Sequence, residues 1–420
     1  MENKINIIED LEFRGLINQS TDLGVLKKAL EKPITLYAGF DPTADSLHVG
    51  SLLLVLTLRR FQEAGHKPIV LVGGATGLIG DPSGKTAERP LSPAKKVKEW
   101  AGDIKNQLEQ FLDFGSDKAQ LVNNYDWLSE MKIIPFLRDI GKNFSVNSMI
   151  AKESVKKRLE TGISFTEFNY QVLQACDYLN LFEKYGCRLQ IGGSDQWGNI
   201  TAGVDLIRRV KREEVYALSI PLVTKADGTK FGKTETGTIW LNSKKTTPYK
   251  FYQFWINTDD REAVKLLKYF TFLSQEKIEK LEGQAKDNPA EREAQRVLAR
   301  EVTGIVHGKE ATVRAEKISD ALFYGNIGEL NKEEIEEGFK NIPSYEIKGR
   351  DKLELVELLV EAGVVSSKRQ AREDIKNGAI YINGKQEMDT GKILQFSDRL
   401  FGEYIVIRRG KKSYYVIRWY

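Results

Sequence analysis

The chain has 420 residues, of which 41% are hydrophobic, 10% aromatic and 29% charged, and its formal net charge is +4. This length and ordinary composition exclude a single small domain, a fibrous protein and a disordered one, and they predict several folded domains. The sequence contains no run of about 18 apolar residues and no signal peptide. Its two separated cysteines and three histidines suggest neither a disulfide framework nor a zinc site. We therefore expect a cytoplasmic protein without a membrane span or a bound metal.

The first half of the chain alternates apolar runs of strand length and helix length. A strand at 34–38, a helix from about 47 to 64 and a strand at 69–72 follow one another. Such a unit implies parallel strands joined by a right-handed crossover. The apolar runs 189–193 and 220–224 predict later strands of the same sheet.

Past about residue 246 the apolar spacing becomes that of helices. Three residues have the pattern of a helix start: Asn288 can cap the helix, Pro289 takes its first position, and the Glu291 side chain can bond back to the cap. Apolar residues then recur at helical spacing as far as Gly308. The polar stretch 331–350 is expected to be a linker.

The last segment is expected to mix helix and strand. Helical spacing at 353–362 is followed by Ser367, which is placed to cap a second helix, and Asn383-Gly384 is typical of a β-hairpin turn. Residues 352–420 carry 13 basic and 9 acidic side chains, a balance that equals the whole net charge. A modest basic excess indicates nucleic-acid binding only together with a matching motif.

A glycine-rich stretch from Gly80 to Thr86 has the composition of a phosphate-binding P-loop but not its spacing. Three residues separate Gly80 from Gly84, where the motif requires four. The spacing of Gly74, Gly77 and Gly80 also departs from the dinucleotide-binding fingerprint. We therefore exclude a P-loop NTPase and a Rossmann dehydrogenase.

Another candidate phosphate site lies where the first predicted strand leads into the first predicted helix, at Asp45 to Ser51. Backbone N–H groups at the start of a helix, together with the helix dipole, favour an anion. Gly50 would let a nucleotide base approach the backbone closely. His48 could contact such a ligand, or it could be only a helix cap or a packed side chain.

The loop Lys230 to Thr234 places Lys230 and Lys233 three residues apart around a glycine. Lysines spaced in this way can wrap a polyphosphate as mobile point charges, although such a loop by itself is usually just solvent-exposed. Together with His48 to Ser51, however, this loop resembles the two signature motifs of the class I aminoacyl-tRNA synthetases.

Five further stretches carry a more specific resemblance: Tyr37 to His48, Gly80 to Lys85, Phe165 to Gln174, Gln190 to Asn199 and Val365 to Gly384. They are similar to the bacterial-type tyrosyl-tRNA synthetases in particular, in one register from about residue 5 to residue 420. The last of them resembles an S4-type RNA-binding domain.

The resemblance implies an α/β fold class with several domains. A Rossmann-like parallel-sheet catalytic domain is expected at 1–245, with a dimer-interface insertion at about 125–160. A helical anticodon-binding domain at 246–330, the linker 331–350 and an α+β S4-like RNA-binding domain at 351–420 would follow. The apolar candidates for the homodimer contact lie between Phe136 and Leu159 and are Phe144, Val146, Met149 and Ile150.

The resemblance also implies tyrosine–tRNA ligase activity. The enzyme would join L-tyrosine to ATP, which brings Mg²⁺ with it, to form tyrosyl-adenylate and pyrophosphate. It would then transfer the tyrosine to the 3′ end of tRNA(Tyr). Because the attacking tyrosine carboxylate is already ionised, no general base is needed, and catalysis would depend on positioning and charge stabilisation. No tightly bound metal or organic cofactor is implied.

The family motifs assign four sets of residues. Those expected to act on the phosphates are Thr43, His48, Lys85, Arg89, Lys230, Lys233 and Thr234. Those expected to hold tyrosine are Tyr37, Asp81, Tyr170, Gln174, Asp177 and Gln196. Those expected to contact ATP are Gly39, Asp41, His48, Gly50, Ser51, Gly193, Asp195 and Lys233. Those expected to bind tRNA are Lys368, Arg369, Arg372, Arg408, Arg409, Lys411 and Lys412.

Within the tyrosine set, Tyr37 and Asp177 resemble the pair that binds the phenol hydroxyl, since Tyr37 can donate a hydrogen bond to it and Asp177 can accept one. Phenylalanine would leave this pair without its shared partner, and the tyrosyl enzymes are the standard example of this effect. Two positions depart from the family pattern. Ser51 stands where a second histidine is usual, and Ala38 offers no side-chain donor to a ribose.

Two alternatives stay open. A tryptophanyl-tRNA synthetase would share the architecture, but the pair Tyr37 and Asp177 and the S4-like tail argue against it. A non-catalytic RNA-binding protein that kept the fold is the other alternative. The presence of His48, Lys230 and Lys233 together with Asp177 argues against that role alone.

Overall fold

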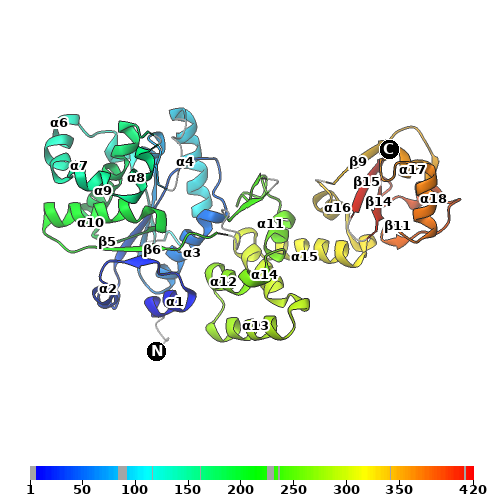
Figure 1. Ribbon diagram of the computed structural model, residues 1–420, viewed down its shortest axis with the longest axis horizontal. Helices are drawn as coiled ribbons and strands as arrows, with labels where there is room; N and C mark the ends of the chain where they lie inside the picture. Colours follow the sequence, from blue (N-terminus) through cyan, green and yellow to red (C-terminus); the bar gives the residue numbers. More distant parts are fainter. Residues whose placement is uncertain are drawn as a thin grey trace. The chain divides into compact units, whose positions relative to one another are not determined.

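The computed structural model describes residues 6–83, 92–115, 117–160, 162–224, 231–234, 237–340, 342–410 and 413–420. The chain divides into two compact units, and Figure 1 follows its course through them. The first unit comprises Met1–Thr246 and Thr258–Leu298, and the second comprises Thr247–Asn257 and Ala299–Tyr420. Within the described residues, no helix combines the length and apolar character needed to cross a bilayer.

The first unit is built on a six-stranded sheet in the order β1-β6-β5-β2-β3-β4. All neighbouring strands pair in parallel except β1, which pairs antiparallel with β6 at one edge. The strands are β1 (Gln19–Ser20), β2 (Thr35–Phe40), β3 (Lys67–Val72), β4 (Gln120–Asn123), β5 (Cys187–Gly193) and β6 (Tyr216–Ile220). The α/β fold class expected from the sequence is confirmed, as are the strands expected at 34–38, 69–72 and 189–193.

The strand expected at 220–224 is wrong, because β6 ends at Ile220 where that strand was expected to begin. Pro221 follows, and its nitrogen carries no hydrogen for the ladder of a sheet. Leu222 is half exposed in the segment that follows. The apolar run 220–224 is thus the end of a strand and the loop after it.

Helices cover both faces of this sheet, as Figure 1 shows for α3 and α4 on one side and α9 and α10 on the other. Alternation along β2 and β3 sends Tyr37, Ile69 and Leu71 into a core shared with α9 and α10. The helices of this unit are α1 (Ile7–Arg14), α2 (Leu23–Ala29), α3 (Val49–Glu63), α4 (Ala94–Leu108), α5 (Tyr125–Leu128), α6 (Ile133–Pro135), α7 (Val146–Ile150), α8 (Glu153–Leu159), α9 (Phe165–Tyr185), α10 (Trp197–Lys211), α12 (Asp260–Phe270) and α13 (Gln275–Asp287), and a β7–β8 hairpin pairs Lys233–Thr234 with Gly237–Thr238.

The helix expected to start at Asn288 begins later. Pro289–Glu291 form only a 3-10 turn, and Arg292 then takes the left-handed backbone conformation, with φ of 54°. The Arg292 guanidinium donates to the carbonyl oxygen of Thr258 at 3.0 Å, a tertiary contact that holds it there. Helix α14 (Glu293–His307) follows and ends before Gly308, as the apolar spacing predicts.

The second unit contains a five-stranded sheet in the order β12-β11-β14-β15-β9 and a two-stranded pair, β10-β13. Its helices are α11 (Pro248–Ile256), α15 (Lys309–Tyr324), α16 (Lys332–Gly338), α17 (Leu355–Glu361) and α18 (Lys368–Lys376), and its strands are β9 (Ser344–Ile347), β10 (Lys352–Glu354), β11 (Ile380–Ile382), β12 (Lys385–Gln386), β13 (Ile393–Gln395), β14 (Tyr404–Arg409) and β15 (Ser413–Trp419). Ser367 caps α18 and Asn383-Gly384 turns between β11 and β12, as predicted.

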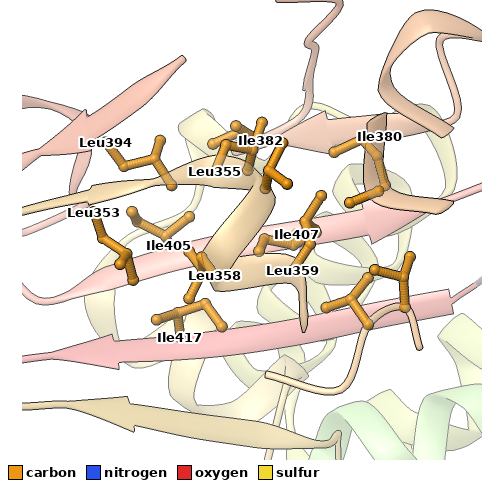
Figure 2. Packing of buried hydrophobic residues seen from close by; sticks show 14 of the residues in the cluster. Leu353, Leu355, Leu358, Leu359, Ile380, Ile382, Leu394, Ile405, Ile407 and Ile417 are labelled. Carbon is orange, nitrogen blue, oxygen red and sulfur yellow. The ribbon is translucent and has the colours of Figure 1, made fainter. Parts of the chain in front are cut away.

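Both faces of the five-stranded sheet are buried inside this unit. Ile405, Ile407 and Ile417 pack against α17 and α18, and Figure 2 shows them facing Leu358 and Leu359. The alternate residues of the same strands, Tyr404, Val406 and Val416, enter a second core, with side chains of α15 and α16. The stretch expected to be a linker contains α16 and also β9, which pairs in parallel with β15, so it belongs to this packed unit.

Candidate active site

Helix α3 begins directly after His48, which is the last residue of the loop that follows β2. The backbone of His48 is extended, with φ of −125°, and its side chain makes no capping hydrogen bond. The imidazole instead lies over the first turn of the helix, because a Cβ built on Gly50 would be 2.7 Å from Cε1 of His48. A side chain at position 50 would therefore displace the imidazole. This reason for a glycine differs from the one expected from the sequence, which was close approach of a nucleotide base to the backbone. Thr43 is exposed on the same loop.

The second signature segment is anchored at Phe231. This side chain is 8% exposed and stacks on Phe270, with ring centroids 5.9 Å apart. The backbone of Lys233 and Thr234 forms β7, whereas their side chains lie outside the described part of the chain. Lys85, Arg89 and Lys230 also lie outside the described residues.

Two adjoining cavities open at the carboxyl ends of β2 and β5, and Gly39, Asp41 and Gly193 line both. All six residues expected to hold tyrosine line the first: Tyr37, Asp81, Tyr170, Gln174, Asp177 and Gln196. Six of the residues expected to contact ATP line the second: Gly39, Asp41, Gly50, Ser51, Gly193 and Asp195. The fold thus gathers both sets at one edge of the parallel sheet, which is where ligands of such sheets bind.

The lining of the first cavity includes a network of polar side chains around Asp81. Its Oδ2 accepts a hydrogen bond from Nε2 of Gln196 at 2.6 Å, and its Oδ1 accepts one from the backbone N–H of Ser83 at 2.9 Å. Asn199 donates to Oε1 of Gln174 at 3.2 Å. The Tyr170 hydroxyl donates to Oδ2 of Asp41 at 2.6 Å. Carboxylate oxygens held in this way can accept from an ammonium group.

Tyr37 and Asp177 also line the first cavity, and they are 1% and 2% exposed. The buried Tyr37 hydroxyl has no hydrogen-bond partner among the described residues. Asp177 accepts from Nδ2 of Asn124 at 3.0 Å and from Nε1 of Trp127 at 2.8 Å. Since buried polar groups are nearly always paired, an unpaired hydroxyl that lines a cavity is a candidate contact for a ligand.

Burial dominates the titration of this pair. It raises the pKa of Asp177 to about 7, although the hydrogen bonds from Asn124 and Trp127 act in the opposite direction. Burial and the charge of Asp177 hold the pKa of Tyr37 well above its usual value. The Tyr37 hydroxyl therefore remains a hydrogen-bond donor at neutral pH, beside a carboxylate that can accept.

The chain matches two families of known proteins. A family described as class I tRNA synthetases (W and Y) matches residues 28–324, and one described as the tyrosine–tRNA ligase SYY-like C-terminal domain matches residues 334–417. Tyrosine–tRNA ligases from Bacillus caldotenax and Geobacillus stearothermophilus are each 61% identical to the chain over 419 residues, 99% of this chain and 100% of theirs. The chain belongs to the tyrosine–tRNA ligase family.

Solved structures agree with the membership in this family. A C-terminally truncated mitochondrial tyrosyl-tRNA synthetase from Aspergillus nidulans matches with a TM-score of 0.69 and 30% identity, over 77% of this chain and 95% of that one. A tryptophanyl-tRNA synthetase from Encephalitozoon cuniculi matches with a TM-score of 0.55 and 14% identity, over 73% of this chain and 87% of that one. The second match shows a shared fold alone, so the fold does not distinguish the two amino acids.

Some residues around this tyrosine–tRNA ligase site could not be assigned from its motifs. Asn124 and Trp127 hold Asp177, and Thr76 donates to Oδ1 of Asp41 at 2.7 Å. Asn124 follows β4, the strand next to β3, and a prediction of strand order is the only signal that could have placed it here. Ala38, one of the departures from the family pattern, is buried in β2 and lines neither cavity, whereas Ser51 lines the second.

The residues expected to bind tRNA in this ligase differ in their surroundings. Arg369 and Arg372 are exposed on α18, and Lys368 pairs with Glu357 at 2.6 Å. Arg408 lies 3.8 Å from the centroid of the Tyr381 ring, and Arg409 pairs with Asp374 at 2.8 Å. Lys411 and Lys412 lie outside the described residues. Arg408 and Arg409 are thus engaged in contacts within the second unit.

Proposed function

We propose that the chain activates L-tyrosine with ATP and Mg²⁺ to form tyrosyl-adenylate and pyrophosphate, and then transfers the tyrosine to the 3′ end of tRNA(Tyr). The observation that carries the substrate is the buried Tyr37 hydroxyl, which has no partner among the described residues and lines one cavity with Asp177. A phenol hydroxyl can accept from Tyr37 while it donates to Asp177. An indole N–H can only donate, so tryptophan would leave Tyr37 unpaired.

The ammonium group of tyrosine would then contact Asp81, Tyr170 and Gln174, which line the same cavity. Gln196, which donates to Asp81 at 2.6 Å, would contact the side of the carboxylate. A substrate held through its hydroxyl and ammonium groups would present its carboxylate toward the second cavity, because the two cavities share Gly39, Asp41 and Gly193. Such positioning converts the attack on the α-phosphate into an effectively unimolecular step.

The second cavity and the loops beside it would hold ATP. Gly50, Gly193 and Asp195 are the candidates for the adenosine, and Thr43 and His48 for the phosphates at the positive end of α3. Lys85, Arg89, Lys230 and Lys233 would stabilise the leaving pyrophosphate, with Thr234 beside them. Mg²⁺ would enter as part of the nucleotide substrate. Ser51 can offer one hydrogen bond where the family usually has histidine, but it carries no charge.

The activity is tested by tyrosine-dependent exchange of pyrophosphate into ATP. Exchange is expected with tyrosine and neither with tryptophan nor with phenylalanine. Exchange with tryptophan in place of tyrosine would favour the tryptophanyl alternative. A folded chain that binds tRNA but makes no adenylate from any of the three would favour the non-catalytic RNA-binding alternative. Asp177→Ala should nearly abolish exchange, because it removes the acceptor for the phenol hydroxyl.

We also propose that the enzyme is a cytoplasmic homodimer, whose contact lies within Phe136 to Leu159. Val146 and Ile150 are exposed in this segment, at 58% and 39%, whereas Met149 is buried and Phe144 packs against the core of its own unit. The exposed pair is thus available to a second copy, as in a C2 contact. A monomer for the unaltered chain in sedimentation at micromolar concentration would contradict this. Val146→Asp should dissociate the dimer.

For tRNA, we propose that residues 246–330 include the anticodon-binding surface and that 351–420 form an S4-like RNA-binding region. The exposed side chains of Arg369 and Arg372 support the second assignment, because cations on one helical face can neutralise successive phosphates. Charging of tRNA(Tyr) that withstands loss of these charges would contradict it.

A further inference from the structure

Trp240 lies directly opposite His48 and contacts it. The two residues form an isolated antiparallel bridge, and their ring centroids are 6.2 Å apart with a 60° tilt. Residues that face one another in an antiparallel pair present their side chains on the same side, and this centroid distance is in the range of favourable ring contacts. The Trp240 ring therefore packs against one side of the His48 imidazole.

The same short segment connects the two signature segments. The N–H of Ile239 donates to the carbonyl oxygen of Gly232 at 2.9 Å, and the carbonyl oxygen of Ile239 accepts from the N–H of Val49 at 3.1 Å. Leu241 donates to the carbonyl oxygen of Leu47 at 2.9 Å. The backbone of one residue, Ile239, thus bonds to the second signature segment through its N–H and to the first turn of α3 through its carbonyl oxygen.

Trp240 is itself in contact with Lys245. The Lys245 ammonium lies 4.8 Å from the centroid of the Trp240 ring and forms an ion pair with Asp45. Asp45 precedes His48 by three residues, so the contacts form a closed chain from Asp45 through Lys245 and Trp240 to His48. The backbone N–H of Trp240 also donates to Oγ1 of Thr246 at 3.0 Å. Such a chain of contacts restricts the orientation of the ring.

We propose that Trp240 is a positioning residue for adenylate formation, which holds the His48 imidazole over the first turn of α3 and couples its placement to the second signature segment. This role rests on the proposed function, in which His48 contacts the phosphates. A contact made to the transition state loses much of its effect when the group that makes it is misplaced by a fraction of an ångström to an ångström. Loss of the ring should therefore slow the chemical step more than it weakens substrate binding.

The test is single-turnover formation of tyrosyl-adenylate by the full chain, with Trp240→Leu and Trp240→Phe. Trp240→Leu is expected to slow the step about tenfold, with tyrosine affinity changed by less than about twofold, and Trp240→Phe should recover most of the rate. Trp100→Leu is a matched control, since it removes a half-buried tryptophan from α4 in the same unit. It should leave the rate within about twofold.

The decisive comparison repeats Trp240→Leu in a His48→Ala background. If the ring acts through the imidazole, the second change should cost less than about twofold once the imidazole is gone. An equal loss in both backgrounds, or an unchanged rate in a folded Trp240→Leu chain, would overturn the proposal. Should Trp240→Leu fail to fold, Lys245→Met keeps the ring and removes its cation, and it should slow the step about threefold only when His48 is present. An unaltered chain that makes no adenylate would overturn the proposed function, and this role with it.

Discussion

Asn124 and Asp177 are joined by a hydrogen bond of 3.0 Å between Nδ2 and Oδ2, although 53 residues separate them in the chain. The same Asn124 amide donates to Oγ1 of Thr76 at 2.9 Å, and Thr76 donates to Asp41. The side-chain carbonyl oxygen of Asn124 accepts from the N–H of Ala75 at 2.8 Å. The buried Asn124 amide, through the Thr76 hydroxyl, therefore connects Asp177 with Asp41, two carboxylates that line the first cavity.

Asn124→Ala should weaken tyrosine binding about tenfold and lower the free energy of unfolding by about 1–3 kcal/mol, because buried partners lose their hydrogen bonds. The Michaelis constant for ATP should change little. Calorimetric titration with tyrosine and thermal unfolding measure the two effects. Asn18→Ala, which removes a side-chain hydrogen bond from the exposed Asn18 to the buried Ser219 in the same unit, is the control and should bind tyrosine normally. Unchanged affinity in Asn124→Ala would contradict a role for this amide in binding.

Tyrosine binding should depend on pH through Asp177. In the ligand-free chain the pKa of this carboxyl is raised to about 7, so it is mostly protonated at pH 6. A phenol hydroxyl that donates to it favours the ionised form, so binding releases a proton below pH 7. Affinity should therefore rise with pH, by at most about tenfold per unit, and become constant above about pH 7.5.

Calorimetry in two buffers with different ionisation enthalpies counts the protons released. The raised pKa of Asp177 also affects folding stability. The contribution of the protonated carboxyl to the free energy of unfolding is present at acid pH and is lost as the pH rises through about 7. Asp177→Asn, which does not titrate, should bind tyrosine weakly and with little dependence on pH. Equal proton release by both chains would assign the effect to another group.

Gly384→Ala should destabilise the second unit strongly. Its φ is +86°, and a Cβ there would lie 1.8 Å from the carbonyl oxygen of Gly325. Gly410 is the matched control, because it also has a positive φ, +63°, but a Cβ would meet nothing within 4 Å. Both substitutions carry left-handed strain of about 1 kcal/mol, and Gly384→Ala should cost at least about 2 kcal/mol more, through displacement of the backbone. Equal unfolding midpoints for the two variants would contradict the close approach.

Deleting residues 352–420 should leave adenylate formation within about twofold of the full chain and strongly weaken tRNA charging. It should also reduce solubility, because β14 and β15 cover Ile318, Ile335 and Phe339 in the part of the second unit that remains. Pyrophosphate exchange, tRNA charging and light scattering measure the three effects. A fully soluble fragment would show that this core is dispensable, and equal loss of exchange and charging would contradict a separate role for the tail.

Neutralising Lys368, Arg369 and Arg372 to glutamine in the full chain separates lost charge from lost packing. All three are exposed on α18, away from its buried positions Ala371 and Ile375. Thermal stability should change by less than about 0.5 kcal/mol each. The dependence of log affinity for tRNA on log salt concentration should become shallower by up to about 2–3 if each cation contacts a phosphate. An unchanged slope would exclude this helix face from the RNA contact.

Several elements could be predicted because their signals are local. The spacing of apolar residues predicts α3 and β3, and the cap at Ser367 and the turn at Asn383-Gly384 depend on neighbouring residues only. The strand expected at 220–224 failed because an apolar run resembles a strand on either side of Pro221. The start of α14 failed because Arg292 is held by Thr258, a residue 34 positions away.

The motifs in the sequence were enough to identify the family and to select the residues that line the two cavities, because a motif is a local pattern of residue types. Only the tertiary structure decided what holds them. Asn124 and Trp127 reach Asp177 from 53 and 50 residues away, and Trp240 reaches His48 across an isolated bridge. Tyr404 and Ile405 are neighbours in β14 but enter different cores, because different helices pack on the two faces of the sheet. Local spacing sets the period of a helix or strand, whereas contacts between distant residues depend on which strands and helices pack side by side.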